Sequence, residues 1–440
     1  MRFGLAISYF DIPFWIMVAG MAVALRLTGR KATTFGALNL GALFLVADLR
    51  TAIAAAAFAL AAWYVLWSVL RVRALAELAQ REAQMVLAGS ASLTGGRGAV
   101  GTLPEPDAGT DRHLDQRARL LAKLATFLTG AALLFPIALF AFYKVSLEFS
   151  IVAEGLRSHS ELTALDLLVK GLRALVFSYV ALRYVEAAHA VLWKKARLID
   201  PLGLAGYLIP FHMLLCGPVN RYDEHLRWES SPIRDDNAGL LGLNDITTGL
   251  FYKFVVAEYL KVFFFGNTLA STSWWDTALI FVYLFFDFAG YSRIALGIGR
   301  WLGVPTPVNF RSPFLATSVT EFFTRWHMSL GSFVLRNIYT PIQLTLTRRW
   351  GVKQAWCAGM IALLTSWLFV GLWHRLSLAF FCYGLGMGAL IWVEKCVRDH
   401  LLKKSWARST WSLRIIQIVG PIYVFIMITT ALHLIMQEIL

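Results

Sequence analysis

Residues 355–393 read AWCAGMIALLTSWLFVGLWHRLSLAFFCYGLGMGALIWV, and this stretch decides the fold class. Neither Ala355–Trp373 nor Leu376–Val393 contains a charged residue. As a helix, each run is long enough to cross a hydrocarbon core of about 30 Å. The sequence therefore predicts two consecutive membrane spans, with His374 and Arg375 between them.

The composition of the whole chain also indicates a membrane protein. Hydrophobic residues make up 58% of the 440 residues and charged residues 15%, whereas soluble domains are about half apolar and about a quarter charged. Further apolar runs predict an all-α polytopic membrane protein with about 10–11 spanning or embedded segments. The predicted segments are 5–25, 35–48, 51–70, 120–143, 164–183, 201–218, 246–265, 274–298, 355–373, 376–393 and 413–437.

Charge and flexibility suggest how the chain is organised. The formal net charge is +14, and the basic residues concentrate in predicted loops, as the positive-inside rule requires. We therefore expect the lipid bilayer as a partner and no nucleic acid. Residues 1–71 are predicted as N-terminal spans, 72–118 as a cytoplasmic loop region and 119–440 as the membrane core. Within the loop region, a short helix is expected before a flexible Gly-rich segment over 89–111.

Polar side chains within apolar surroundings are costly and mark functional candidates. His374 lies between two apolar runs, and an imidazole can take a proton from a hydroxyl and return it to a leaving group. The alternative is a structural histidine at a helix break or at the membrane surface. No CxxC, HExxH, Walker or nucleophile-elbow pattern is present, so we expect no bound metal or nucleotide cofactor.

A second polar group lies in residues 305–345, where prolines predict short or re-entrant helices shielded from lipid. In EFFTRWHMSL, Glu321 and Arg325 are four residues apart and can pair on a helix, while Thr324 and His327 are three apart. His327 is a candidate for positioning a substrate or a catalytic group. Alternatively, it ties this segment together.

Asp287 forms a third candidate, because it lies within the aromatic run LFFDFAGYS and must be paired, protonated or hydrated. Arg311 and Arg325 are the partners that we expect for it. The GxGxxxG pattern that begins at Gly297 predicts close helix packing.

These motifs together resemble the membrane-bound O-acyltransferase (MBOAT) family, in its bacterial branch with the teichoic acid D-alanyltransferase and the alginate O-acetylation membrane protein. The resemblance covers about residues 200–380, and several motifs in the right order are far more specific than any one of them. The matching stretches are Cys216–Tyr222, Leu250–Ala257, Leu284–Ser292, Asn309–Phe310, Pro313–Phe314, Glu321–Leu330, Arg336–Tyr339 and Gly371–His374.

The resemblance implies a ring of helices around a central tunnel, in a multi-pass protein of the cytoplasmic (inner) membrane. It implies that His374 and His327 are catalytic. An acyl group, D-alanyl or acetyl, would arrive from the cytoplasm as a thioester on carrier-protein phosphopantetheine or coenzyme A. The acceptor would be a hydroxyl of an extracytoplasmic envelope glycan or a partner acyltransferase. The residues expected to line the tunnel are Asp287, Arg325, Arg336, Asn337 and Trp373.

Three positions depart from the family pattern: Asn337 replaces an aspartate, Arg375 a glycine, and Arg293 an aspartate of the alginate-type proteins. Two other functions stay open at this point. One is a non-catalytic transport or export scaffold, which would keep its function after His374→Ala. The other is acylation of a small lipid or metabolite rather than a polymer.

Overall fold

The computed structural model describes residues 11–28, 31–46, 49–94, 113–132, 134, 138, 177–214, 217–230, 237–265, 273–401 and 410–439. Nearly all of these residues are helical, which confirms the all-α membrane fold. The α-helices are α1 (Ile12–Leu27), α2 (Lys31–Val46), α3 (Leu49–Thr94), α6 (Phe177–Leu192), α7 (Pro201–Leu208), α8 (Tyr222–Ser230), α9 (Ala238–Leu250), α10 (Glu258–Phe265), α11 (Trp274–Leu302), α12 (Val319–Arg325), α13 (Met328–Val334), α14 (Thr340–Trp350), α15 (Ala355–His374), α16 (Leu378–Leu401) and α17 (Thr410–Ile439). A further helix covers 113–132. Shorter pieces are 3₁₀ turns at Phe211–Met213, Pro313–Leu315 and Val352–Gln354, and π-helical turns at Phe251–Ala257 and Leu335–Tyr339.

Within the described part of the chain, five helical segments are long and apolar enough to cross a membrane. They are Ala55–Met85, Trp274–Leu302, Val352–His374, Leu378–Leu401 and Arg414–Gln437. The pair predicted on either side of His374 is thus confirmed as α15 and α16. The count of 10–11 spans stays a prediction, since the segments at 120–143 and 164–183 lie partly outside the described residues.

The segment predicted at 201–218 does not form one long helix. α7 ends at Leu208, and a 3₁₀ turn follows at Phe211–Met213. Pro210 lies between them, and proline lacks the backbone N–H that would continue the helix. The residues of α7 are nevertheless mostly buried, so this segment is an internal packing element.

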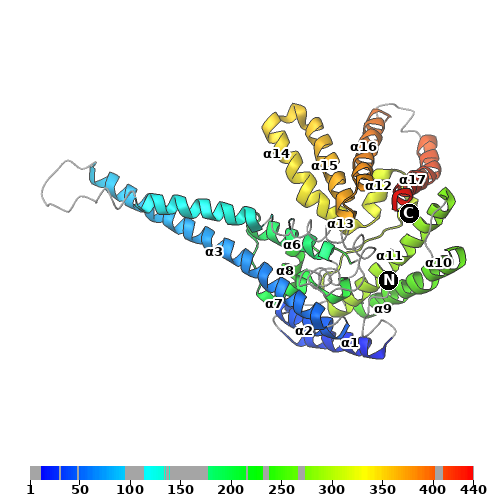
Figure 1. The fold of residues 1–440 in the computed structure, drawn as a ribbon, viewed down its shortest axis with the longest axis horizontal. Helices are drawn as coiled ribbons and strands as arrows, with labels where there is room; N and C mark the ends of the chain where they lie inside the picture. Colours follow the sequence, from blue (N-terminus) through cyan, green and yellow to red (C-terminus); the bar gives the residue numbers. More distant parts are fainter. Residues whose placement is uncertain are drawn as a thin grey trace, which may run out of the picture.

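α3 corrects the predicted boundary after residue 71. It is one helix of 46 residues, about 69 Å long at 1.5 Å per residue. Figure 1 shows it projecting from the body of the molecule beside the helix over 113–132. The segment expected as a separate short helix extends α3, because it is rich in good helix formers and contains no proline. The helix continues to Thr94, past the expected loop start at residue 89, and residues 95–111 lie outside the described ones.

Residues 305–345 form short helices, as predicted, and these pack into the core. A small apolar cluster joins them to α6 and α15, and we call it the junction cluster. Its buried members are Leu182, Val219, Leu330, Phe333, Val334 and Trp373. It brings together four parts of the chain: α6, the segment before α8, α13 and α15.

α9 and α11 pack with their backbones in near contact. A Cβ atom on Gly297 would lie 2.6 Å from the carbonyl oxygen of Gly242, and one on Gly290 would lie 2.8 Å from that of Gly249. Side chains cannot occupy such positions, so only glycine permits this approach. The packing role predicted for Gly297 is confirmed. Gly303, in the same pattern, instead ends α11 with a left-handed φ of 67°.

Candidate active site

His327 lies in the break between α12 and α13. Its backbone has φ 47° and ψ 50°, a left-handed conformation that few residues other than glycine adopt. α12 ends at Arg325, so Thr324 and His327 do not share a helix and the expectation drawn from their spacing is wrong. An antiparallel bridge between Phe310 and Trp326 holds this break in place.

A buried hydrogen-bond network centred on Asn309 supports the backbone next to His327. The Asn309 Oδ1 atom accepts from Ser329 Oγ at 2.6 Å and from the Ser329 backbone N–H at 3.3 Å, and Nδ2 donates to Ser292 Oγ at 3.3 Å. The Asn309 carbonyl accepts from the Met328 N–H at 3.0 Å. Ser329 Oγ also accepts from the Val219 N–H at 3.0 Å. Four chain segments are therefore fixed around one asparagine.

The His327 imidazole is buried against aromatic side chains. Its side chain lies edge-on to Phe288, with ring centroids 4.8 Å apart, and neither ring nitrogen has a hydrogen-bond partner in another described residue. Leaving such a buried group unpaired costs about 1–3 kcal/mol. A native structure with a buried polar atom of this kind calls for an explanation, and a substrate that bonds to it would supply one.

His374 is the last residue of α15 and lies near His327. The two imidazoles are close enough to interact electrostatically. The preceding Trp373 is buried and donates from Nε1 to the Ser178 carbonyl at 3.5 Å. Tyr179 links the two histidine segments, with ring centroids 5.4 Å from Trp373 and 6.3 Å from His327. The structure thus brings together His327, His374 and Trp373, three candidate site residues from the sequence, and adds Tyr179, which the sequence analysis did not single out.

Arg336 and Asn337 belong to a second polar cluster, centred on Glu186 of α6. The buried Glu186 carboxylate accepts from Arg336 Nη2 at 3.3 Å and from Asn337 Nδ2 at 2.5 Å. Asn337 Oδ1 lies 2.7 Å from His189 Nδ1. The sequence analysis did not single out Glu186 and His189. Their spacing of three residues within an apolar run would place both on one face of a helix. Asn337 lacks the carboxylate of the aspartate that it replaces, and the carboxylate of Glu186 lies next to it.

Asp287 and Arg325 lie in separate ion pairs. Asp287 pairs with Lys253 rather than with Arg311 or Arg325, so the predicted partners are wrong. The cause is the close approach of α11 to the π-helical turn that follows α9, which puts residue 253 opposite residue 287. Arg325 pairs with Glu321 at 2.5 Å, as predicted from their spacing.

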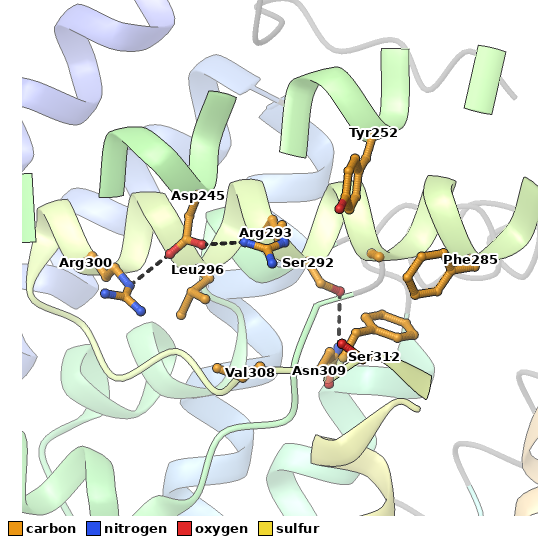
Figure 2. A pocket seen from close by; sticks show the side chains of 12 residues that line it. Asp245, Tyr252, Phe285, Ser292, Arg293, Leu296, Arg300, Val308, Asn309 and Ser312 are labelled. Carbon is orange, nitrogen blue, oxygen red and sulfur yellow. Dashed lines mark hydrogen bonds and ion pairs between the residues drawn. The ribbon is translucent and has the colours of Figure 1, made fainter. Parts of the chain in front are cut away.

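A cavity of about 320 Å³ borders the Asn309 network. Figure 2 shows Asp245 between Arg293 and Arg300 at one part of this cavity, and Asn309 with Ser292 at another. The lining residues are Asp245, Tyr252, Phe285, Ala289, Ser292, Arg293, Leu296, Arg300, Val308, Asn309, Phe310 and Ser312. Three charged side chains therefore face a space beside the candidate active site.

The sequence of this chain matches a known family. Residues 134–437 match the family model described as MBOAT, membrane-bound O-acyltransferase family. This is more than half of the chain, and the chain belongs to this family. The resemblance drawn from the motifs is confirmed.

Named relatives lie in the same bacterial branch. The chain is 27% identical over 267 residues to the teichoic acid D-alanyltransferase of Bacillus subtilis, which is 56% of this chain and 66% of that protein. It is 27% identical over 227 residues to the probable alginate O-acetylase AlgI of Pseudomonas syringae, which is 50% of this chain and 42% of that one. It is 28% identical over 208 residues to the peptidoglycan O-acetyltransferase of Helicobacter pylori, which is 44% of this chain and 37% of that protein. The match therefore spans between about a third and two thirds of these relatives' lengths.

Proposed function

We propose that this protein is an O-acyltransferase that moves a D-alanyl or acetyl group from a thioester to a hydroxyl group. The observation that carries the proposal is the buried His327 imidazole, whose ring nitrogens have no partner in another described residue, next to His374. Family membership supports the reaction class, and the names of the relatives support these two acyl groups.

In the proposed reaction, His374 is the general base. Its imidazole takes the proton of the acceptor hydroxyl as the oxygen attacks the thioester carbonyl carbon. The new C–O bond forms, the C–S bond breaks, and the proton passes from His374 to the leaving sulfur. A neutral His327 donates its ring N–H to the carbonyl oxygen, which gains negative charge in the transition state. Direct attack of this kind requires no covalent enzyme intermediate.

The other candidate residues have supporting roles in this proposal. Trp373, a member of the junction cluster, and Tyr179, which packs against it, fix the spacing of the two imidazoles. Arg336 and Asn337, held by Glu186, stabilise the π-helical turn Leu335–Tyr339 against α6. We further propose that the donor, on a phosphopantetheine carrier protein or as acyl-coenzyme A, approaches from the cytoplasmic side of the inner membrane. The acceptor, an envelope glycan or a partner acyltransferase, approaches from the opposite side.

The test is acyl transfer in membranes that contain equal amounts of wild type, His374→Ala or His327→Ala. Labelled acetyl and D-alanyl thioesters serve as donors, and label in the envelope fraction is the readout. General acid–base catalysis contributes about 10²–10⁴-fold, so we expect His374→Ala to lose at least about 100-fold. His400→Ala, at the exposed end of α16, is the matched control and should retain wild-type activity.

Two results bear on the assignment. Label transfer that requires His374 and not His400 supports it, and the donor that works identifies the acyl group. Wild-type transfer rates in the His374→Ala protein would contradict the proposed mechanism.

A further inference from the structure

The cavity beside the Asn309 network has one carboxylate shared by two guanidinium groups (Figure 2). Asp245 Oδ1 accepts a hydrogen bond from Arg293 Nη1 at 3.0 Å. Arg300 Nε lies 3.0 Å from Asp245 Oδ2, an ion-pair contact without hydrogen-bond geometry. The Asp245 side chain is 8% exposed, whereas those of Arg293 and Arg300 are 42% and 31% exposed. The carboxylate is thus buried beneath two arginines that reach the cavity.

This group of three side chains carries an unbalanced positive charge. Two cations face one anion, and no other acceptor for either guanidinium is present among the described residues. Each guanidinium has five N–H donors, most of which remain available. Arg293 also lies within the predicted span Trp274–Leu302, where a charged side chain is costly and therefore usually functional. The cavity is therefore suited to an anionic ligand.

The rest of the cavity wall indicates the shape of that ligand. Apolar and aromatic side chains line its length, among them Tyr252, Phe285 and Val308. Asn309 lines it too, and the Asn309 carbonyl bonds to the residue that follows His327. A ligand with an anionic group at the arginines would place an apolar portion against this wall.

We propose that Arg293 and Arg300 bind the phosphate of the acyl donor's 4′-phosphopantetheine arm. This inference rests on the proposed function, because it assumes a thioester donor. Arginine forks match the oxygens of a phosphate and form charge-assisted hydrogen bonds with them. The phosphate and the thioester lie at opposite ends of the linear arm, so in this proposal the phosphate binds at the arginines and the thioester reaches the histidines. Asp245 orients both arginines and competes with the phosphate for them.

The test measures ligand binding and not acyl transfer, so that it is independent of the catalytic histidines. The full chain is placed in nanodiscs of phosphatidylcholine, and affinities for 4′-phosphopantetheine and for pantetheine are measured by calorimetry. We expect the phosphate to strengthen binding at least about tenfold. Arg293→Gln and Arg300→Gln should each remove about that factor for 4′-phosphopantetheine and leave pantetheine unaffected. Arg227→Gln, which removes an exposed charge from α8, should change neither affinity.

Two further variants separate binding from folding. Arg293→Lys keeps the charge without the fork, and we expect an affinity between those of wild type and Arg293→Gln. Asp245→Asn frees the arginines, so binding of 4′-phosphopantetheine should become tighter. Thermal unfolding of each variant verifies that the compared proteins are folded.

Three outcomes would overturn the proposal. Equal affinities for 4′-phosphopantetheine and pantetheine would show that the phosphate makes no contact. Weaker binding in Asp245→Asn would show that the three side chains only stabilise the fold. In parallel nanodiscs that also contain phosphatidic acid, arginine-dependent binding of that lipid without binding of 4′-phosphopantetheine would assign the site to a lipid headgroup. In each case acyl transfer that depends on His374 would still support the proposed function.

Discussion

Replacing Asn309 by alanine tests whether the buried network positions the histidines. The substitution removes the acceptor for the Ser329 hydroxyl and backbone N–H, and the donor to Ser292. Each buried partner left unsatisfied costs about 1–3 kcal/mol. Since two of the three bonds are long, at 3.3 Å, we expect a total loss of stability of about 2–4 kcal/mol. The backbone of His327 should also relax from its left-handed conformation.

The effect on catalysis should exceed the effect on folding. A shift of about 1 Å in a reacting group can lower the rate about 100-fold, so transfer per folded Asn309→Ala molecule should fall by about 10–100-fold. Folded protein is quantified by size-exclusion chromatography and thermal unfolding, and the rate is divided by that amount.

Asn39→Ala is the matched control for this experiment. Asn39 is also buried and makes two hydrogen bonds, to the Ile209 carbonyl at 2.8 Å and from the Phe211 N–H at 2.7 Å. Its loss should lower stability without changing the rate per folded molecule, because it lies in the packing of α2 against α7. If both variants kept the wild-type rate per folded molecule, the idea that Asn309 positions His327 would be refuted.

Two other variants test the packing and the buried charge. Gly297→Val forces a branched side chain against the Gly242 carbonyl, and overpacking costs about 1–3 kcal/mol, so its melting temperature should fall. A Cβ atom at Gly386 would have open space around it, so Gly386→Val should have the melting temperature of the wild type. Equal falls in melting temperature for the two variants would contradict the close approach of α9 and α11. Glu186→Ala leaves Arg336 without its carboxylate and should cost about 3–5 kcal/mol. Glu186→Gln keeps an acceptor oxygen and should lose less, and identical melting temperatures for the two variants would argue against the ion pair.

The residues that stand out against an apolar background could be found from the sequence. His374 and His327 are polar residues within apolar stretches of sequence, where such residues are rare and therefore conspicuous. The helices α15 and α16 follow from uninterrupted apolar runs, and the Glu321–Arg325 pair follows from helix periodicity. Each of these predictions depends on neighbouring residues alone.

Partners that meet only through packing could not be found in this way. The pairing of Lys253 with Asp287 depends on the glycines that bring α9 and α11 together, and no local rule states which helix faces which. Glu186 and Asn337 are 151 residues apart in the sequence. The left-handed backbone of His327 is likewise imposed by hydrogen bonds from distant segments. The intrinsic conformational preference of histidine does not predict that backbone conformation.

The contact between Trp373 and Ser178 joins residues 195 positions apart. Closing so long a loop is slow compared with forming the helices themselves. A nascent chain therefore completes α6, α11 and α13 before α15 can supply either His374 or the tryptophan beside it. Until that moment the proposed centre has one imidazole and lacks its proposed base. In the proposed mechanism, acyl transfer therefore begins only after α15 has been added to the rest of the site.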